Sequence, residues 1–124
     1  SIEAQKNIYC LDNDNTPAAR LATEYLIGQG HRKIAFITGP STHPDANQRL
    51  EGYKSALAAK KIVFSRSLLA TGDYTEAGGY SAMNQLIDSK KEFTAVFAAN
   101  DEMAFGAMLA LYRRGFFLVR QQIG

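Results

Sequence analysis

A strand and a helix meet almost without a gap in Phe93-Thr-Ala-Val-Phe-Ala-Ala-Asn-Asp-Glu-Met-Ala-Phe-Gly-Ala-Met108. Residues 94–99 are small, β-branched or aromatic, which is typical of a strand covered on both faces. Asn100 and Asp101 interrupt the apolar run where that strand should end, and helical spacing begins directly after them. In parallel α/β sheets, ligands bind where strands lead into helices. The two polar residues therefore either face a ligand or cap the following helix.

The same alternation of strand and helix occurs four times along the chain. Apolar strands are expected at residues 7–11, 34–38, 68–70 and 94–99, and helical apolar spacing follows each of them. This pattern predicts a single α/β domain, a three-layer sandwich in which helices cover both faces of a parallel, doubly wound sheet.

Polar clusters follow all four strands. Right-handed crossovers bring the carboxyl ends of parallel strands to one edge of the sheet, so these clusters should converge there. One polar strand end alone suggests a helix cap, but four of them at one edge predict the wall of a binding pocket. The clusters are residues 12–15, 38–45, 73–74 and 100–101.

Composition and charge argue against several classes of function. The chain has 124 residues, 46% of them apolar, which suits one domain with a real core. Its net charge of +2 comes from scattered basic residues, so the chain is not expected to contact nucleic acid by itself. The single cysteine, Cys10, has no partner for an internal disulfide or a zinc site. With no signal-peptide pattern and no apolar run near the ~20 residues of a membrane helix, a reducing cytoplasmic compartment is expected.

Common cofactor and metal motifs are missing from the sequence. It contains neither GxGxxG nor GxxxxGK[ST], and no serine lies in a GxSxG elbow. His31 and His43 have no metal-like spacing, so no metal and no cofactor are expected. His31 is expected to be structural, whereas His43 lies in a loop near the pocket edge.

One motif favours an enzyme. Residues 12–16, Asp-Asn-Asp-Asn-Thr, fit DxDxT and resemble the nucleophile motif of haloacid-dehalogenase-type phosphatases. In that family the first aspartate attacks phosphorus, the second moves a proton, and magnesium neutralises charge. Thr38 would supply the second motif, but no later acidic pair completes the magnesium site. A magnesium-dependent phosphatase therefore stays an alternative, and the leading expectation is that the chain is not an enzyme.

Several segments together resemble the lactose/galactose-repressor (LacI/GalR) family of bacterial transcription regulators. The most extended are Gly30-His-Arg-Lys-Ile-Ala-Phe-Ile-Thr-Gly-Pro40 and Arg49-Leu-Glu-Gly-Tyr53. Order and spacing agree over residues 8–115. The other matching segments are 11–13, 22–27, 72–74 and 94–97 on through 104–108.

The resemblance implies a periplasmic-binding-protein-like type I effector domain, of which residues 1–124 are the carboxyl-side subdomain. In that family two α/β subdomains clamp a small molecule, usually a sugar or nucleoside-type ligand, and a separate headpiece binds operator DNA. The partner subdomain and the headpiece are expected in a longer parent protein. The leading hypothesis is a sugar-sensing subdomain of a dimeric cytoplasmic repressor, and a periplasmic sugar-binding transport protein is the alternative.

The resemblance also assigns ligand-binding roles to five residues. Arg49 matches an arginine that binds effector hydroxyls or carboxylates through its rigid fork of donors, although a surface arginine is the other interpretation. Tyr74 falls where an aromatic ring stacks on the ligand, unless it is a core residue. Asn100 matches a pocket residue that donates and accepts at once. Asp45 in the pocket loop and Asn13 after the first strand are further candidates, with turn or cap roles as alternatives.

The last helix carries more apolar surface than a helix on a sheet needs. Phe105, Met108 and Tyr112 form a second apolar face, and the family places positions matching Phe105 and Met108 near its dimer contact. A homodimer through this face is therefore expected, unless the face is a wide core-facing stripe. Asp101 is expected to cap this helix, which would leave Asn100 for the pocket.

The end of the chain departs from the family pattern. The family continues as Gly-x-x-Val-Pro into a fifth strand that ends in Gly-[FY]-Asp. Here Gly115 leads into Phe116-Phe-Leu-Val-Arg-Gln-Gln-Ile-Gly124, without proline. The fifth strand and its pocket carboxylate are therefore expected to be missing, so that the unpaired sheet self-associates or borrows a strand.

Overall fold

The described residues form a parallel sheet flanked by helices. The computed structural model describes residues 7–12 and 18–122. Its five strands lie in the order β3-β2-β4-β1-β5, and all neighbours are parallel. In chain order the elements are β1 (Asn7–Asp12), α1 (Ala18–Gly28), β2 (Ile34–Thr38), α2 (Pro44–Ala59), η2 (Arg66–Leu68), β3 (Leu69–Thr71), α3 (Glu76–Asp88), β4 (Ala95–Ala98), α4 (Asp101–Arg113) and β5 (Phe117–Gln122).

The central strands β2 and β4 are covered on both faces. Every residue of both strands is buried, as their near-continuous apolar sequences predict. Phe36 pairs with Phe97 in the parallel register, and the two rings stack with their centroids 4.5 Å apart. Side chains alternate between the faces of a strand, so β2 and β4 contribute to two separate cores.

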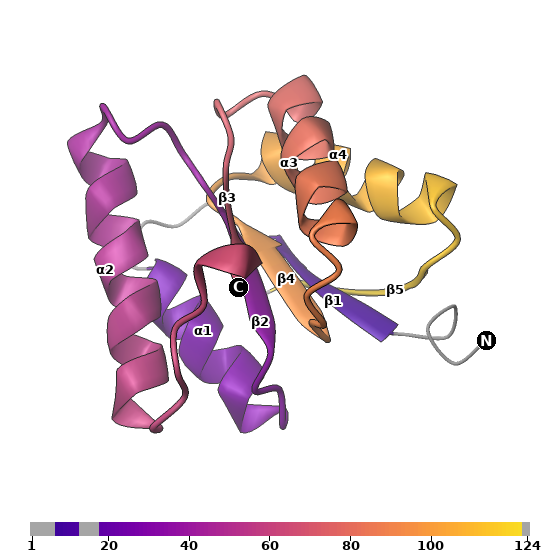
Figure 1. Ribbon diagram of the computed structural model, residues 1–124. Coiled ribbons are helices and arrows are strands. Elements are labelled where there is room, and N and C mark those ends of the chain that lie inside the picture. Colours follow the sequence, from indigo (N-terminus) through magenta and orange to yellow (C-terminus); the bar gives the residue numbers. More distant parts are fainter. Residues whose placement is uncertain (1–6, 13–17, 123–124) are drawn as a thin grey trace.

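Helices α1 and α2 cover one face of the sheet, and α3 and α4 cover the other (Figure 1). The first core contains Leu26, Phe36 and Tyr53, and the second contains Met83 and Met103. The buried hydroxyl of Tyr53 donates to the carbonyl oxygen of Ile34 at 2.6 Å, and burial raises the pKa of this phenol. The predicted α/β class, with helices on both faces of a parallel sheet, is confirmed.

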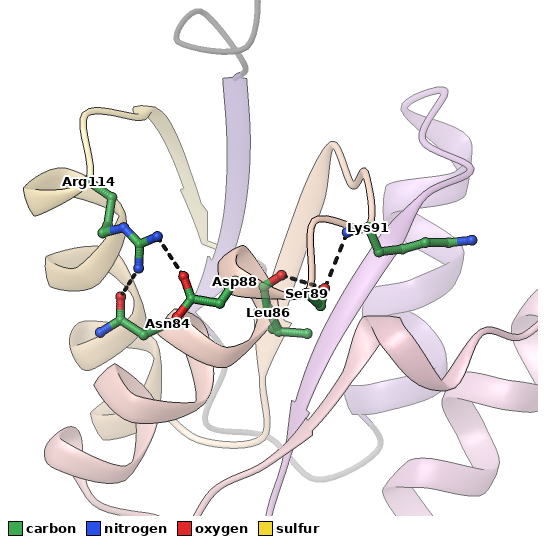
Figure 2. Close-up of polar contacts among 6 residues, drawn as sticks. All are labelled: Asn84, Leu86, Asp88, Ser89, Lys91 and Arg114. Atoms are coloured by element: carbon green, nitrogen blue, oxygen red, sulfur yellow. Dashed lines mark hydrogen bonds and ion pairs between the residues drawn. The ribbon is translucent and has the colours of Figure 1, made fainter.

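Helices α3 and α4 pack closely because glycines lie where they cross. A Cβ on Gly79 would overlap the backbone of Met103, and a Cβ on Gly106 would overlap the carbonyl oxygen of Glu76. Near the carboxyl ends of both helices, Arg114 donates to Asn84 at 2.9 Å and to Asp88 at 2.7 Å (Figure 2). The pair therefore forms one rigid layer behind the sheet edge to which their amino ends point.

The prediction that the fifth strand is missing is wrong. β5 pairs with β1 in parallel over the whole of both strands, from Asn7 beside Phe117 to Asp12 beside Gln122. Pairing needs an extended backbone with a few apolar residues, and residues 117–119 supply these without the family's Val-Pro signature. β1 lies between β4 and β5, so β4 is paired on both sides. The side of β1 that was expected to stay unpaired is therefore covered by β5 of the same chain, so the reason to expect a borrowed strand is lost.

Candidate functional site

The carboxyl ends of β3, β2 and β4 lie side by side and form the edge where the candidate site is built. The loop after β2 leads to α2 on one face, whereas the loops after β3 and β4 lead to α3 and α4 on the other. Open α/β sheets bind ligands in crevices where neighbouring connections diverge in this way. Backbone hydrogen bonds from Gly72 to Thr38 at 2.7 Å and from Ala99 to Ile37 at 2.9 Å extend the pairing beyond the strands. The loops therefore start from fixed positions.

Arg49 and Tyr74 meet at this edge. Arg49 lies in the second turn of α2, and its Nη1 donates to the hydroxyl oxygen of Tyr74 at 3.3 Å. Both side chains are partly buried. The structure thus brings together two residues that the sequence placed in one pocket, and their contact with a ligand stays a prediction.

Tyr74 has a backbone conformation that bulky residues rarely adopt. Its φ of 72° lies in the left-handed region. Its N–H donates to the sulfur of Met103 at 3.3 Å, and its carbonyl oxygen accepts from Nδ2 of Asn100 at 3.0 Å. Its ring lies over Gly39, where a Cβ would overlap it. Strained residues that several neighbours hold in place cluster at functional sites, which marks Tyr74 as a candidate.

Asn100 is the cap of α4, so the expectation that Asp101 caps this helix is wrong. Asn100 is extended (φ −144°, ψ 171°), and its Oδ1 accepts from the backbone N–H of Met103 at 3.0 Å. Asp101 is already the first helical residue, where its negative charge interacts favourably with the helix dipole. A carboxamide has two N–H groups and two acceptor lone pairs, so Asn100 has one of each beyond its two bonds. A ligand contact by Asn100 therefore stays a prediction beside its structural role.

The turn before α3 is organised by Asp73 and Thr75. Oδ1 of Asp73 accepts from the hydroxyl of Thr75 at 2.6 Å and from its backbone N–H at 3.0 Å. The hydroxyl of Thr75 in turn accepts from the N–H of Gly78 at 3.0 Å and caps the helix. The hydroxyl bond, followed by the backbone bond, lowers the pKa of Asp73. These bonds fix the chain directly after Tyr74.

The loop after β2 is shorter than the sequence suggested. Helix α2 begins at Pro44, so Asp45 is an exposed residue of its first turn and not a loop or cap residue. His43 occupies the cap position without a side-chain capping bond. Its ring stands edge-on to the ring of Tyr74, with the centroids 5.6 Å apart. Sequence reasoning gave no role to His43 or to Gly39. Both lie in the loop after a buried strand, and Gly39 also falls in the segment 30–40 that resembles the family.

The remaining predicted residues fall outside the described residues or at the opposite edge of the sheet. Asn13 and most of the DxDxT motif fall outside the described residues. Within residues 7–12 and 18–122, no group of three or more His, Cys, Asp or Glu side chains could hold a metal ion. The ring Nδ1 of His31 lies 2.7 Å from the hydroxyl of Thr94, at the opposite edge of the sheet, in line with a structural role. No helix in the part of the chain that the structure describes is long and apolar enough to cross a membrane.

The second apolar face of α4 is partly different from the prediction. Phe105 and Tyr112 are 53% and 74% exposed, but Met108 packs against the core. Leu109 is 38% exposed and lies one turn from Phe105. The exposed stripe therefore runs through Phe105, Leu109 and Tyr112, and a dimer contact through it stays a prediction.

Comparison with known proteins gives the same family for the whole chain. The family model of periplasmic binding proteins and the sugar-binding domain of the LacI family matches residues 2–124. The regulator AscG of Escherichia coli K12 is 39% identical over 109 residues, which are 88% of this chain and 32% of AscG. The ribose operon repressor of the same organism is 44% identical over 93 residues, 75% of this chain and 28% of the repressor. The chain thus spans about a third of the length of these curated relatives.

Solved structures agree in fold and sequence. A sugar-binding LacI-family regulator from Escherichia coli, complexed with phosphate, superposes with a TM-score of 0.81 at 36% identity, over 93% of this chain and 42% of that one. A complex of the regulator CelR with cellobiose gives a TM-score of 0.80 at 35% identity, over 93% and 36%. These relatives are transcriptional regulators and not enzymes, in agreement with the expectation for this chain. The chain belongs to the family of periplasmic binding proteins and LacI-type sugar-binding domains, and it corresponds to part of the effector domain of a LacI/GalR regulator.

Proposed function

We propose that this chain is the carboxyl-side effector-sensing subdomain of a bacterial repressor that responds to a sugar or nucleoside-type molecule. The observation that carries the proposal is the convergence of Arg49, Tyr74 and Asn100 through direct contacts at one sheet edge. A guanidinium fork and a carboxamide suit adjacent hydroxyl groups, and an aromatic ring suits the apolar face of a sugar or base. The cellobiose complex of the relative CelR supports this class of ligand.

The proposed action is a shift between conformations, without a chemical step. The effector binds between this subdomain and a second one in the complete protein, and it stabilises one angle between them. That angle sets the spacing of two DNA-binding headpieces in a cytoplasmic homodimer. Such a shift requires only that the effector binds one arrangement more tightly than the other.

The test is calorimetry on the complete protein with cellobiose, ribose and adenosine as probes. Arg49→Ala should weaken binding of the tightest probe by about 10- to 100-fold, because a charged hydrogen-bond donor is lost. Arg32→Ala is the matched control, since Arg32 is exposed in the turn before β2, at the opposite edge. Unchanged affinity in Arg49→Ala would contradict the assignment of Arg49 to the site. Absence of binding by every probe would contradict the proposed function.

A transport-binding protein of the same fold is the second candidate, because the matching family also includes periplasmic binding proteins. Both candidates predict sugar binding, so only a test of DNA binding distinguishes them. A repressor should retard its operator fragment in a gel-shift assay and change that affinity when the effector is added. A complete protein that binds the probe but no DNA would be a carrier.

A further inference from the structure

We infer that Gly39 is a positioning residue of the effector site, which sets the place of the Tyr74 ring and so determines how tightly the effector binds. This inference rests on the proposed function, because its main readout is effector binding. It adds a residue to which the sequence assigns no role in the site.

The backbone of Gly39 does not require glycine. Gly39 follows β2 directly and is buried, and the glycines with left-handed φ in the described ranges are Gly30 and Gly115. An alanine can therefore adopt the backbone conformation of Gly39. The obstacle is space, because the three atoms nearest to a Cβ there are Cζ, Oη and Cε1 of Tyr74. The phenol end of Tyr74 occupies the room that a side chain on Gly39 would fill.

The ring is the part of this contact that can move. The backbone of Tyr74 is held by Asn100 at its carbonyl oxygen and by Met103 at its N–H. Gly39 is fixed by the adjoining pairing of Gly72 with Thr38. A tyrosine side chain has two rotatable χ angles, so an added Cβ on Gly39 should turn the ring and leave the loops in place.

Turning the ring separates Tyr74 from both of its neighbours in the site. The Tyr74 hydroxyl, which lies 3.3 Å from Nη1 of Arg49 in the unmodified chain, would lose this contact. The ring would also lose its edge-on contact with His43. The aromatic surface offered to the effector then faces a different direction. Affinity should fall although neither Arg49 nor Tyr74 has been changed.

The experiment is a double-mutant cycle on the complete protein, measured by calorimetry with the tightest-binding of cellobiose, ribose and adenosine. Gly39→Ala should weaken binding about ten-fold, the scale of one stacked aromatic contact. Tyr74→Gly removes the ring and suits the left-handed φ. If Gly39 acts through the ring, adding Gly39→Ala to Tyr74→Gly should cause no further loss. Gly28→Ala is the matched control and should bind normally, because a Cβ there meets nothing within 4 Å.

The outcomes separate this inference from the proposed function. Unchanged affinity in Gly39→Ala, or losses that simply add in the double variant, overturns the inference while Arg49→Ala still tests the site. Absence of probe binding by the unmodified protein overturns both. If Gly39→Ala does not fold, circular dichroism of the double variant decides. Recovered folding supports overlap with the ring, and continued unfolding overturns it.

Discussion

Nη1 of Arg49 in α2 donates to the hydroxyl oxygen of Tyr74 at 3.3 Å. Tyr74 lies 25 residues later, in the loop between β3 and α3. The distance is at the long end for a hydrogen bond, so the contact is weak and a better acceptor can replace it. It nevertheless holds the guanidinium beside the phenol hydroxyl at the sheet edge. Arg49 keeps further N–H donors for a second oxygen. Under the proposed function, an effector hydroxyl would displace the phenol oxygen with little loss of bonding.

Replacing Asn100 by alanine should destabilise the fold as well as the site. The change removes the cap of α4 and the bond to the carbonyl of Tyr74 together. We expect a loss of about 1–3 kcal/mol in the free energy of unfolding, measured by urea denaturation. Asn100→Asp keeps an oxygen for the cap, but its second carboxylate oxygen faces and repels the carbonyl oxygen of Tyr74, so this variant should also lose stability.

Asn47→Ala is the control for Asn100→Ala, because the exposed side chain of Asn47 caps no helix and donates to the carbonyl of Ser41. It should change the free energy of unfolding by less than about 0.5 kcal/mol. Equal stability of Asn100→Ala and Asn47→Ala would contradict a stabilising role for the two bonds of Asn100, to Met103 and to Tyr74.

Gly106→Ala should destabilise the layer formed by α3 and α4. Alanine is the better helix former by about 1 kcal/mol, but its Cβ would overlap the backbone of Glu76, which cannot rotate away. We expect a net loss of about 1–3 kcal/mol in a thermal or urea melt. Gly28→Ala gives the helix preference without the overlap and should be neutral or stabilising, so the same result for both variants would contradict the close crossing.

Most of the fold could be predicted from the sequence because its central strands are continuously apolar and apolar residues at helical spacing follow each strand. β2 begins and ends at the predicted residues, Ile34 and Thr38. The sequence does not predict β5, because the residues after Gly115 lack the family's Val-Pro and Gly-[FY]-Asp signatures. Strand pairing depends on backbone groups and extended conformation, so Phe117–Gln122 forms a strand without these motifs.

The candidate site was predictable as a region but not in its details. The sheet edge followed from topology, and the approach of Arg49 to Tyr74 agrees with the family resemblance. The sequence predicts the cap one residue late, because Asn100 and Asp101 are both good caps and only the geometry at the end of β4 distinguishes them. The left-handed φ of Tyr74 depends on Asn100, Met103 and Gly39, which are distant in sequence, so no local pattern could show it.

Stability should depend on pH through His31. Partial burial lowers the pKa of this imidazole in the folded state, so the unfolded chain binds more protons near neutral pH. The associated stability is present above the unfolded value of about 6.5 and is lost as pH falls below it. We expect the free energy of unfolding to decrease between about pH 7 and pH 5. In His31→Asn this decrease should be smaller, which urea melts at several pH values can measure.

The control for this pH series is Gln29→Asn, an exposed change in the same turn that adds no titrating group. It should retain the pH dependence of the unmodified chain. A series in which His31→Asn and Gln29→Asn have equal slopes would show that other groups cause the decrease.

Dimerisation of the complete protein should depend on the exposed stripe of α4. Aromatic residues dominate the energetics of interfaces, and Tyr112 and Phe105 are 74% and 53% exposed on one helix face with Leu109 between them. Phe105→Glu with Tyr112→Glu should raise the dimer dissociation constant by about ten-fold or more, as followed by light scattering over micromolar concentrations. Val63→Glu is the matched control, because Val63 is an 88% exposed apolar residue outside this stripe, and it should leave the dimer unchanged. A clean monomer of the unmodified protein, or equal association of both variants, would show that the stripe is not a dimer contact.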